Sequence, residues 1–113
     1  MRHTVSLKHN YEFRSLYARG KNTAGVYLAM YMRRNNRIGD VTRLGISVSS
    51  KLGGAVVRNR VRRRIKEAYR LSEDRFLRGV DIVVVARSRA VGADFSVIWD
   101  ELLRLGGKLG VVL

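Results

Sequence analysis

The stretch from Ala55 to about Phe76 constrains the fold of this chain more than any other, because it has the pattern of a long amphipathic helix. At roughly 100° per residue, its small and apolar side chains cover about one-third of a helical wheel. These side chains belong to Val57, Val61, Ile65, Ala68, Tyr69 and Ser72. A helix with such a stripe must bury it against a sheet or other helices, which predicts a layered domain with a core.

The rest of this predicted helix is strongly basic. Between residues 51 and 70 one acid, Glu67, accompanies eight basic residues, which are Lys51, Arg58, Arg60, Arg62, Arg63, Arg64, Lys66 and Arg70. Like charges one turn apart destabilise a helix by roughly a few tenths of a kcal/mol per pair, and bound phosphates would reverse this repulsion. Guanidinium groups also suit bidentate phosphate contacts. The pattern therefore predicts a polyanion as the partner of this helix.

The overall charge supports the same interpretation. The 113 residues include 23 Lys and Arg against 9 Asp and Glu, a formal net charge of +14, and clustered basic charge of this size is typical of nucleic-acid binding. We expect one RNA-binding domain over residues 1–113 with a short basic leader at about 1–9. The absence of Cys excludes disulfides and thiolate metal sites, and no apolar run is long enough to cross a bilayer. We therefore expect a soluble cytoplasmic protein with no membrane partner.

Two further helices flank the basic one. Asn10 is a good N-cap for a helix from about Tyr11 to Arg19, and Gly20 suits its end. Asp94 suits the N-cap of a last helix, which Gly106-Gly107 is predicted to stop.

Apolar periodicity predicts strands at 26–34, 43–49 and 80–86, with turn-forming residues between 35 and 40. The strand at 80–86 is apolar on both faces except at Asp81, which is typical of a central strand. The order of helix, two or more strands, helix, strand and helix predicts an α/β (α+β) sandwich. It predicts two layers, in which helices cover a small sheet of about four strands, in an αβββαβα-like order.

No pattern predicts a catalytic or metal site on the polypeptide. His3 and His9 lack the acidic or thiol neighbours that a metal site needs. The carboxylates are scattered and form no pair for two-metal chemistry, and Ser47 has no nearby His or elbow motif. Gly53-Gly54 precede a helix without completing a phosphate-binding loop.

Aromatic residues give a second candidate surface. Phe13 and Tyr17 share a face of the first helix, and Tyr27 and Tyr31 share a face of the first strand. Such rings either line a groove that stacks nucleic-acid bases or pack in the core. Spacing alone favours the core.

The bacterial ribonuclease P protein subunit has a signature that closely resembles the run KLGGAVVRNRVRR at 51–63 and IKEAYR at 65–70. The Arg-Asn-Arg core at 58–60, with two basic residues after one apolar position, is the specific part. Further agreement lies at Glu12-Phe13, at LGISVS in 44–49 and at DIVVVAR in 81–87. The resemblance covers most of the chain in the expected order.

This resemblance implies a protein cofactor of a catalytic RNA, with no DNA partner. In that family the RNA holds the active-site magnesium ions and removes the 5′ leader of precursor tRNA, while the protein binds the catalytic RNA and the leader. The implied fold is an α/β sandwich with a cleft between the first helix and the sheet. The basic helix lies in a left-handed βαβ crossover, against the usual right-handed rule.

The resemblance also assigns residues. It implies that Phe13, Tyr17 and Tyr31 line the cleft that binds the leader, with weaker support for Tyr27. The residues expected to contact the catalytic RNA are Lys51, Arg58, Asn59, Arg60, Arg62, Arg63, Lys66 and Arg70. Arg64 departs from the family pattern, in which this position is often apolar.

Two alternatives remain. A ribosomal or other structural RNA-binding protein would have similar basicity and a similar fold, but it would not stimulate cleavage of precursor tRNA. A metal-dependent nuclease would cleave precursor tRNA without any partner RNA, which the scattered carboxylates do not predict.

Overall fold

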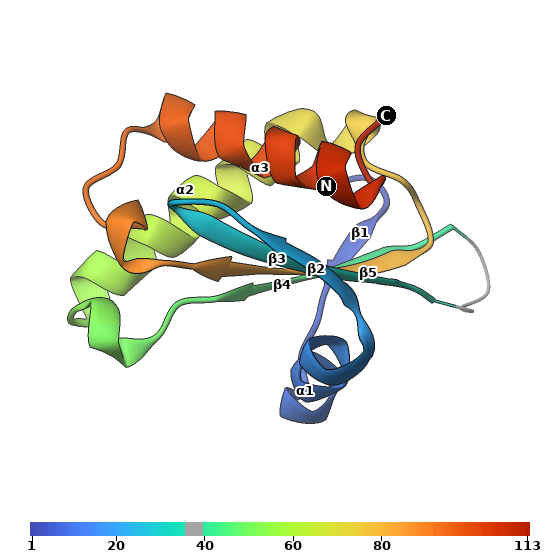
Figure 1. The fold of residues 1–113 in the computed structure, drawn as a ribbon, viewed down its shortest axis with the longest axis horizontal. Coiled ribbons are helices and arrows are strands. Elements are labelled where there is room, and N and C mark those ends of the chain that lie inside the picture. Colours follow the sequence, from blue (N-terminus) through green and yellow to red (C-terminus); the bar gives the residue numbers. More distant parts are fainter. Residues whose placement is uncertain (36–39) are drawn as a thin grey trace.

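Three helices and five strands make up the regular structure in the computed structural model, which describes residues 1–35 and 40–113 (Figure 1). The helices are α1 (Asn10–Arg19), α2 (Ala55–Ser72) and α3 (Phe95–Leu109). The strands are β1 (Thr4–Ser6), β2 (Lys21–Ala24), β3 (Leu28–Arg34), β4 (Thr42–Ser47) and β5 (Val80–Ala86). The predicted turn between 35 and 40 includes residues 36–39, which lie outside the described residues. Within the described residues, no helix is long and apolar enough to cross a membrane.

The strands form one sheet in the order β1-β4-β5-β3-β2. β5 is central, as its apolar sequence predicted, and pairs with β4 in parallel and with β3 in antiparallel orientation. β1 pairs with β4 in parallel, and the last pair of residues is Ser6 and Leu44. In the described part of the chain, the outer edge of β4 therefore has no strand partner after Leu44.

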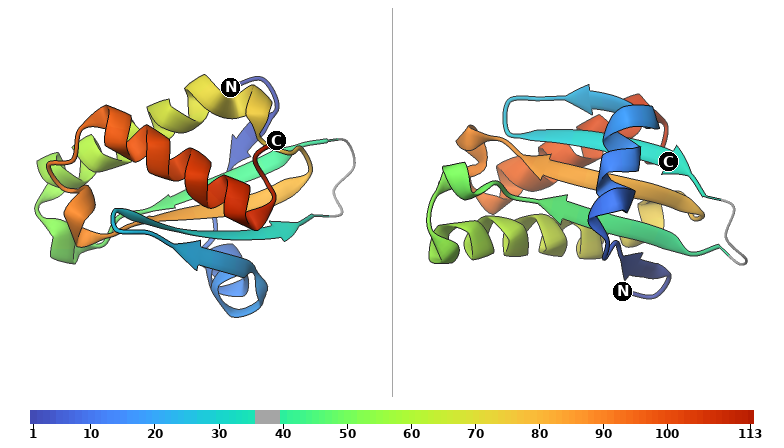
Figure 2. Two further views of the ribbon diagram at one scale, coloured as in Figure 1. Left: turned by 45° about the horizontal axis from the view of Figure 1, so that its top comes forward. Right: turned by 90° about the horizontal axis from the view of Figure 1, so that it is seen from below.

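α2 connects the parallel neighbours β4 and β5 as a βαβ unit. In the right-hand view of Figure 2, seen from the α1 side, both strands point the same way and α2 lies behind the sheet. With β5 on the side of β4 away from β1, this path is a left-handed crossover, as the family resemblance implied.

The helices lie on both faces of the sheet (Figure 1). α2 and α3 cover one face and enclose the main core, into which β5 directs Ile82 and Val84. α1 lies on the other face, where Leu16 packs with Leu7 and Val83 in a smaller cluster. This alternation follows from the two-residue period of a strand. The predicted α/β sandwich is confirmed, with five strands rather than about four. Because helices lie on both faces of the sheet, the described residues form three layers rather than the predicted two.

Two short strands were not located from their own residues, although β2 supplies the third strand that the αβββαβα-like order places between the first two helices. β1 lies inside the expected leader, and its residues bond to distant parts of the chain, including Thr4 Oγ1 to the Tyr69 hydroxyl at 2.8 Å. β2 has the polar sequence KNTA and pairs with β3 at the edge of the sheet. Neither segment has the length or the alternation that identifies a strand.

The predicted N-cap of α1 is wrong by one residue. His9, not Asn10, is the N-cap, because the Glu12 carboxylate accepts the His9 backbone N–H at 3.3 Å in a capping box. Histidine is not among the residues that favour this position, so the sequence pointed to the adjacent Asn.

The predicted end of α3 is also wrong. The helix continues through Gly106-Gly107 to Leu109 and ends at Gly110, whose φ of 76° is left-handed. Gly106 is buried because the C-terminal tail crosses it: a Cβ there would collide with the side chain of Val112. This glycine allows close packing rather than a helix stop.

Candidate RNA-binding surface

The three rings assigned to the leader cleft come together on the α1 face of the sheet. The rings of Tyr17 and Tyr31 meet edge to face, with centroids 4.9 Å apart. Phe13 lies over Gly45 of β4, where a Cβ would come within 2.6 Å of the Phe13 Cζ. Glycine at 45 therefore lets the ring rest on the strand backbone.

These three rings pack against neighbouring side chains and are also partly exposed to solvent. Phe13 and Tyr31 are half-buried beside the Leu16 cluster, and Tyr17 is 39% exposed. Tyr27 differs, because it precedes β3 and packs against the main core on the other face. The core interpretation therefore holds for Tyr27, while the other three rings remain accessible to a ligand.

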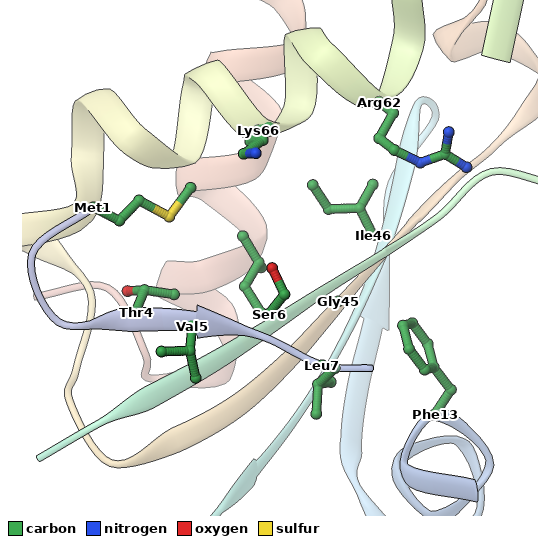
Figure 3. Close-up of a pocket in the computed structure, with 11 residues that line it drawn as sticks. Met1, Thr4, Val5, Ser6, Leu7, Phe13, Gly45, Ile46, Arg62 and Lys66 are labelled. Atoms are coloured by element: carbon green, nitrogen blue, oxygen red, sulfur yellow. The ribbon is translucent and has the colours of Figure 1, made fainter. Parts of the chain in front are cut away.

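The unpaired edge of β4 forms the floor of a groove beside Phe13. On one side of the ring the groove is lined from α1 and β4, including Arg14, Tyr17 and Ser47. On the other side it continues between β1 and α2, as Figure 3 shows. Phe13, Ile46 and Arg62 line both parts, so the Phe13 and Tyr17 rings and the basic helix share one continuous groove. Tyr31 is not among the described lining residues and adjoins the groove through its contact with Tyr17.

The basic residues of α2 point to two sides of the helix. Arg62 and Lys66 line the groove that contains Phe13 (Figure 3). Arg60, Arg63 and Arg64 line a separate depression towards α3, together with Glu67 and Phe95. The single basic face predicted from the sequence is therefore two faces.

The remaining predicted RNA contacts lie around these two sides. Lys51 is exposed in the 3-10 turn before α2, and the exposed Asn59 accepts a 3.1 Å hydrogen bond from Arg62. Arg58 is half-buried, with its Nε lacking a hydrogen-bond partner among the described residues. Arg70 is exposed and paired with Glu67, and the bond between them raises the pKa of Arg70 and lowers that of Glu67.

Arg64, which departs from the family pattern, has a structural contact. Its Nη1 donates a 2.9 Å hydrogen bond to the carbonyl of Ala93, just before α3. The long side chain therefore joins α2 to the start of α3 at a position where an apolar residue would only pack.

Sequence reasoning missed a charged network under α1. Arg43 of β4 donates to both carboxylate oxygens of Asp81, at 2.8 and 2.5 Å, and to the carboxylate of Glu12 on α1. Asn35 donates to Asp81 at 2.9 Å. The one available signal was Asp81 itself, a carboxylate within a buried strand.

The network keeps its groups charged. Burial alone would raise the pKa of Asp81, but hydrogen bonds from Arg43 and Asn35 lower it below its ordinary value. Burial likewise opposes ionisation of Glu12, and the His9 backbone N–H and the Arg43 charge lower its pKa further than burial raises it. The bond to Asp81 raises the pKa of Arg43.

Among the described residues, no group of three or more His, Cys, Asp or Glu side chains is placed to hold a metal ion. The described lining of the groove on both sides of Phe13 contains arginine and lysine but no carboxylate. This donor set suits phosphate rather than a cation.

A basic helix beside a ring-lined groove on an α/β sandwich defines a class of small RNA-binding proteins. Residues 1–110 match the model of the Ribonuclease P family. The ribonuclease P protein component of Clostridium acetobutylicum is 40% identical over 107 residues, which cover 95% of this chain and 90% of that protein. That of Clostridioides difficile is 48% identical over 103 residues, covering 90% and 89%.

Solved structures of RNase P proteins have the same fold as this chain. The Staphylococcus aureus RNase P protein superposes with a TM-score of 0.86 at 34% identity, covering 96% of this chain and 97% of that one. The Thermotoga maritima RNase P protein gives 0.80 at 31% identity, covering 88% and 93%. The chain therefore belongs to the ribonuclease P protein family, as its signature indicated.

Proposed function

We propose that this chain is the protein subunit of ribonuclease P, binding the catalytic RNA and the 5′ leader of precursor tRNA. In this role it assists the endonucleolytic cut that produces the mature tRNA 5′ end. The observation that carries the proposal is the groove in which Phe13 lies between Tyr17 on one side and Lys66 on the other, while Arg62 lines both parts. Rings that stack bases and cations that bind phosphates suit a single RNA strand of any sequence.

The two sides of α2 suggest a division of contacts. Arg62 and Lys66 face the groove and suit leader phosphates in addition to the catalytic RNA. Arg60 and Arg63 point away from the groove and are free to contact the catalytic RNA while the leader is bound. Lys51, Arg58, Asn59 and Arg70 extend the RNA contact along the same helix and the turn before it.

The polypeptide supplies binding rather than chemistry in this proposal. Magnesium ions, held mainly by the partner RNA, supply the activated water and charge stabilisation when they are bound. The groove cations then hold the leader phosphates near that RNA, and the rings orient the bases. A cytoplasmic location with precursor tRNA as substrate, and without DNA or membrane partners, accords with this role.

Reconstitution tests the proposal. The protein is added to ribonuclease P RNA and precursor tRNA at low magnesium, and the rate of 5′ cleavage is measured. We expect a clear gain over the RNA alone and no cleavage by the protein alone. The absence of a gain would refute the proposal and favour the ribosomal alternative, and cleavage without RNA would favour a nuclease.

A further inference from the structure

The charged network under α1 is unusually deep for an ion cluster. The side chains of Asp81, Glu12 and Arg43 are 1%, 9% and 12% exposed. They come from three different elements: β5, α1 and β4. Arg43 bridges the two carboxylates, so it links the first helix to the centre of the sheet.

Such a network is a weak source of stability. Removing three charges from water costs about as much as their mutual attraction returns, and well-packed apolar residues usually serve as well. What a hydrogen-bonded ion cluster adds is direction, because its bonds have a required distance and angle, whereas apolar contacts tolerate sliding. α1 otherwise packs on the sheet mainly through Leu16 and the neighbouring rings.

The network also adjoins the rings of Phe13 and Tyr31. Glu12 precedes Phe13 on α1, and Arg43 lies two residues before Gly45, on which Phe13 rests. Arg33, two residues after Tyr31 on β3, donates to Ser15 of α1 at 2.6 Å and lies 3.9 Å from Asp81. The charged groups therefore hold α1 against β3, which carries Tyr31, and against β4, on which Phe13 rests.

We propose that Glu12 and Arg43 are positioning residues for leader binding. They hold α1 at the height and rotation at which Phe13 rests on Gly45 and Tyr17 meets Tyr31, and they act on the leader only through these rings. The inference rests on the proposed function, because it assigns the groove to the leader.

Glu12→Gln tests this role, because the substitution keeps the size of the side chain and removes the charge that Arg43 binds. The matched control is Glu101→Gln. Glu101 is a carboxylate of similar burial on α3, and it accepts the backbone N–H groups of Tyr27 and Leu28 at 2.6 and 2.7 Å, away from the groove. Both variants lose one buried carboxylate charge.

The reconstituted holoenzyme is used to measure binding of tRNA with and without a leader, and the free protein is used to measure binding of the catalytic RNA. We expect Glu12→Gln to lower the preference for the leader by about five-fold, which corresponds to one weakened stacking contact. Affinity for the catalytic RNA should stay within two-fold, since α2 is unchanged. Glu101→Gln should leave the leader preference intact.

Three results would overturn the inference. They are an unchanged leader preference in Glu12→Gln, an equal loss in Glu101→Gln, and an equal loss of affinity for the catalytic RNA, which would indicate a general structural role. If Glu12→Gln does not fold, Arg43→Lys is measured instead. It keeps the charge but loses the planar fork, and a wild-type leader preference there also overturns the inference. A wild-type enzyme without any leader preference would instead refute the proposed function, and the inference with it.

Discussion

Acidic residues are scarce in this chain, and several of them hold the structure together from inside. Of the nine Asp and Glu residues, the four that are buried are Glu12, Glu73, Asp81 and Glu101. Glu73 accepts the backbone N–H groups of Arg2 and His3 at 2.9 and 3.2 Å, and so ties the residues just before β1 to the turn that follows α2. Because these carboxylates are satisfied internally, the outer surface retains most of the positive charge available to bind RNA.

The hydrogen bonds of the Glu73 carboxylate predict that the folded protein loses stability at low pH. Burial opposes its ionisation, but hydrogen bonds from Thr4 and from the Arg2 and His3 backbone lower its pKa to about 2. Since the folded pKa lies below the unfolded value of about 4.3, the stabilisation is fully present above that value and is lost as the pH falls towards 2. Its size is at most about 3 kcal/mol.

Urea unfolding of wild type and Glu73→Gln between pH 6 and pH 3 measures this contribution. The variant should be less stable at pH 6, and the difference between the two proteins should shrink as the pH falls. A difference in the free energy of unfolding that is independent of pH would contradict the assignment.

At the same scale, Phe13→Ala should weaken binding of precursor tRNA more than of mature tRNA. Base stacking on one ring contributes about 1–3 kcal/mol, so the expected loss of leader preference is about five-fold or more. Tyr11→Ala is the matched control, because this ring is on the same helix, is 63% exposed and stacks on His9 outside the groove. Equal losses for both tRNAs would assign Phe13 to the core alone.

At the scale of elements, α2 combines three tasks on one helix. Val61, Ile65 and Tyr69 fill the main core, one basic side faces the groove, and the other faces the start of α3. A helix has room for this because positions three and four residues apart share a side, while the next residue points elsewhere. The position of each basic residue along α2 therefore decides which side it faces, and the number of basic residues alone does not predict this.

Arg62→Gln and Arg60→Gln form a matched pair that tests this division. Both remove one exposed or half-exposed guanidinium from the same helix, two residues apart. We expect Arg62→Gln to reduce the preference for leader-bearing tRNA, and Arg60→Gln to reduce affinity for the catalytic RNA without changing that preference. Each should lower the slope of log affinity against log salt by about one. Indistinguishable effects of the two variants would contradict a two-sided helix.

At the scale of the whole molecule, the C-terminal tail closes the main core. Val111 is buried, and the Leu77 N–H donates to its carbonyl at 2.8 Å. The tail passes directly over Gly106, next to Phe76. The end of the chain thus packs on the connection between α2 and β5 and on α3, elements that are distant in sequence.

Alanine substitutions of two adjacent glycines in α3 test whether the C-terminal tail packs on the core in this way. Gly106→Ala should destabilise the protein by about 1–3 kcal/mol, because the added methyl group displaces Val112. Gly107→Ala has open space and should stabilise it by about 0.5–1 kcal/mol through helix propensity. The free energies of unfolding in urea give both values, and equal effects would contradict the packing of the tail on Gly106.

By itself, the sequence determined the elements whose signal is local and repeated. The amphipathic pattern of α2, the apolar run of β5 and the signature around Arg58-Asn59-Arg60 were sufficient for the central helix, the central strand and the family. These features hold because each residue's preference agrees with its neighbours over many positions.

Tertiary structure alone decided the features that depend on distant partners. β1 and β2 are too short to be identified without the strands they pair with, and the Glu12–Arg43–Asp81 network joins residues up to 69 positions apart. The sides of α2 that Arg60 and Arg62 face depend on where α1 and α3 pack. Spacing within a segment does not encode such contacts, because their energies arise only when the folded chain brings the partners together.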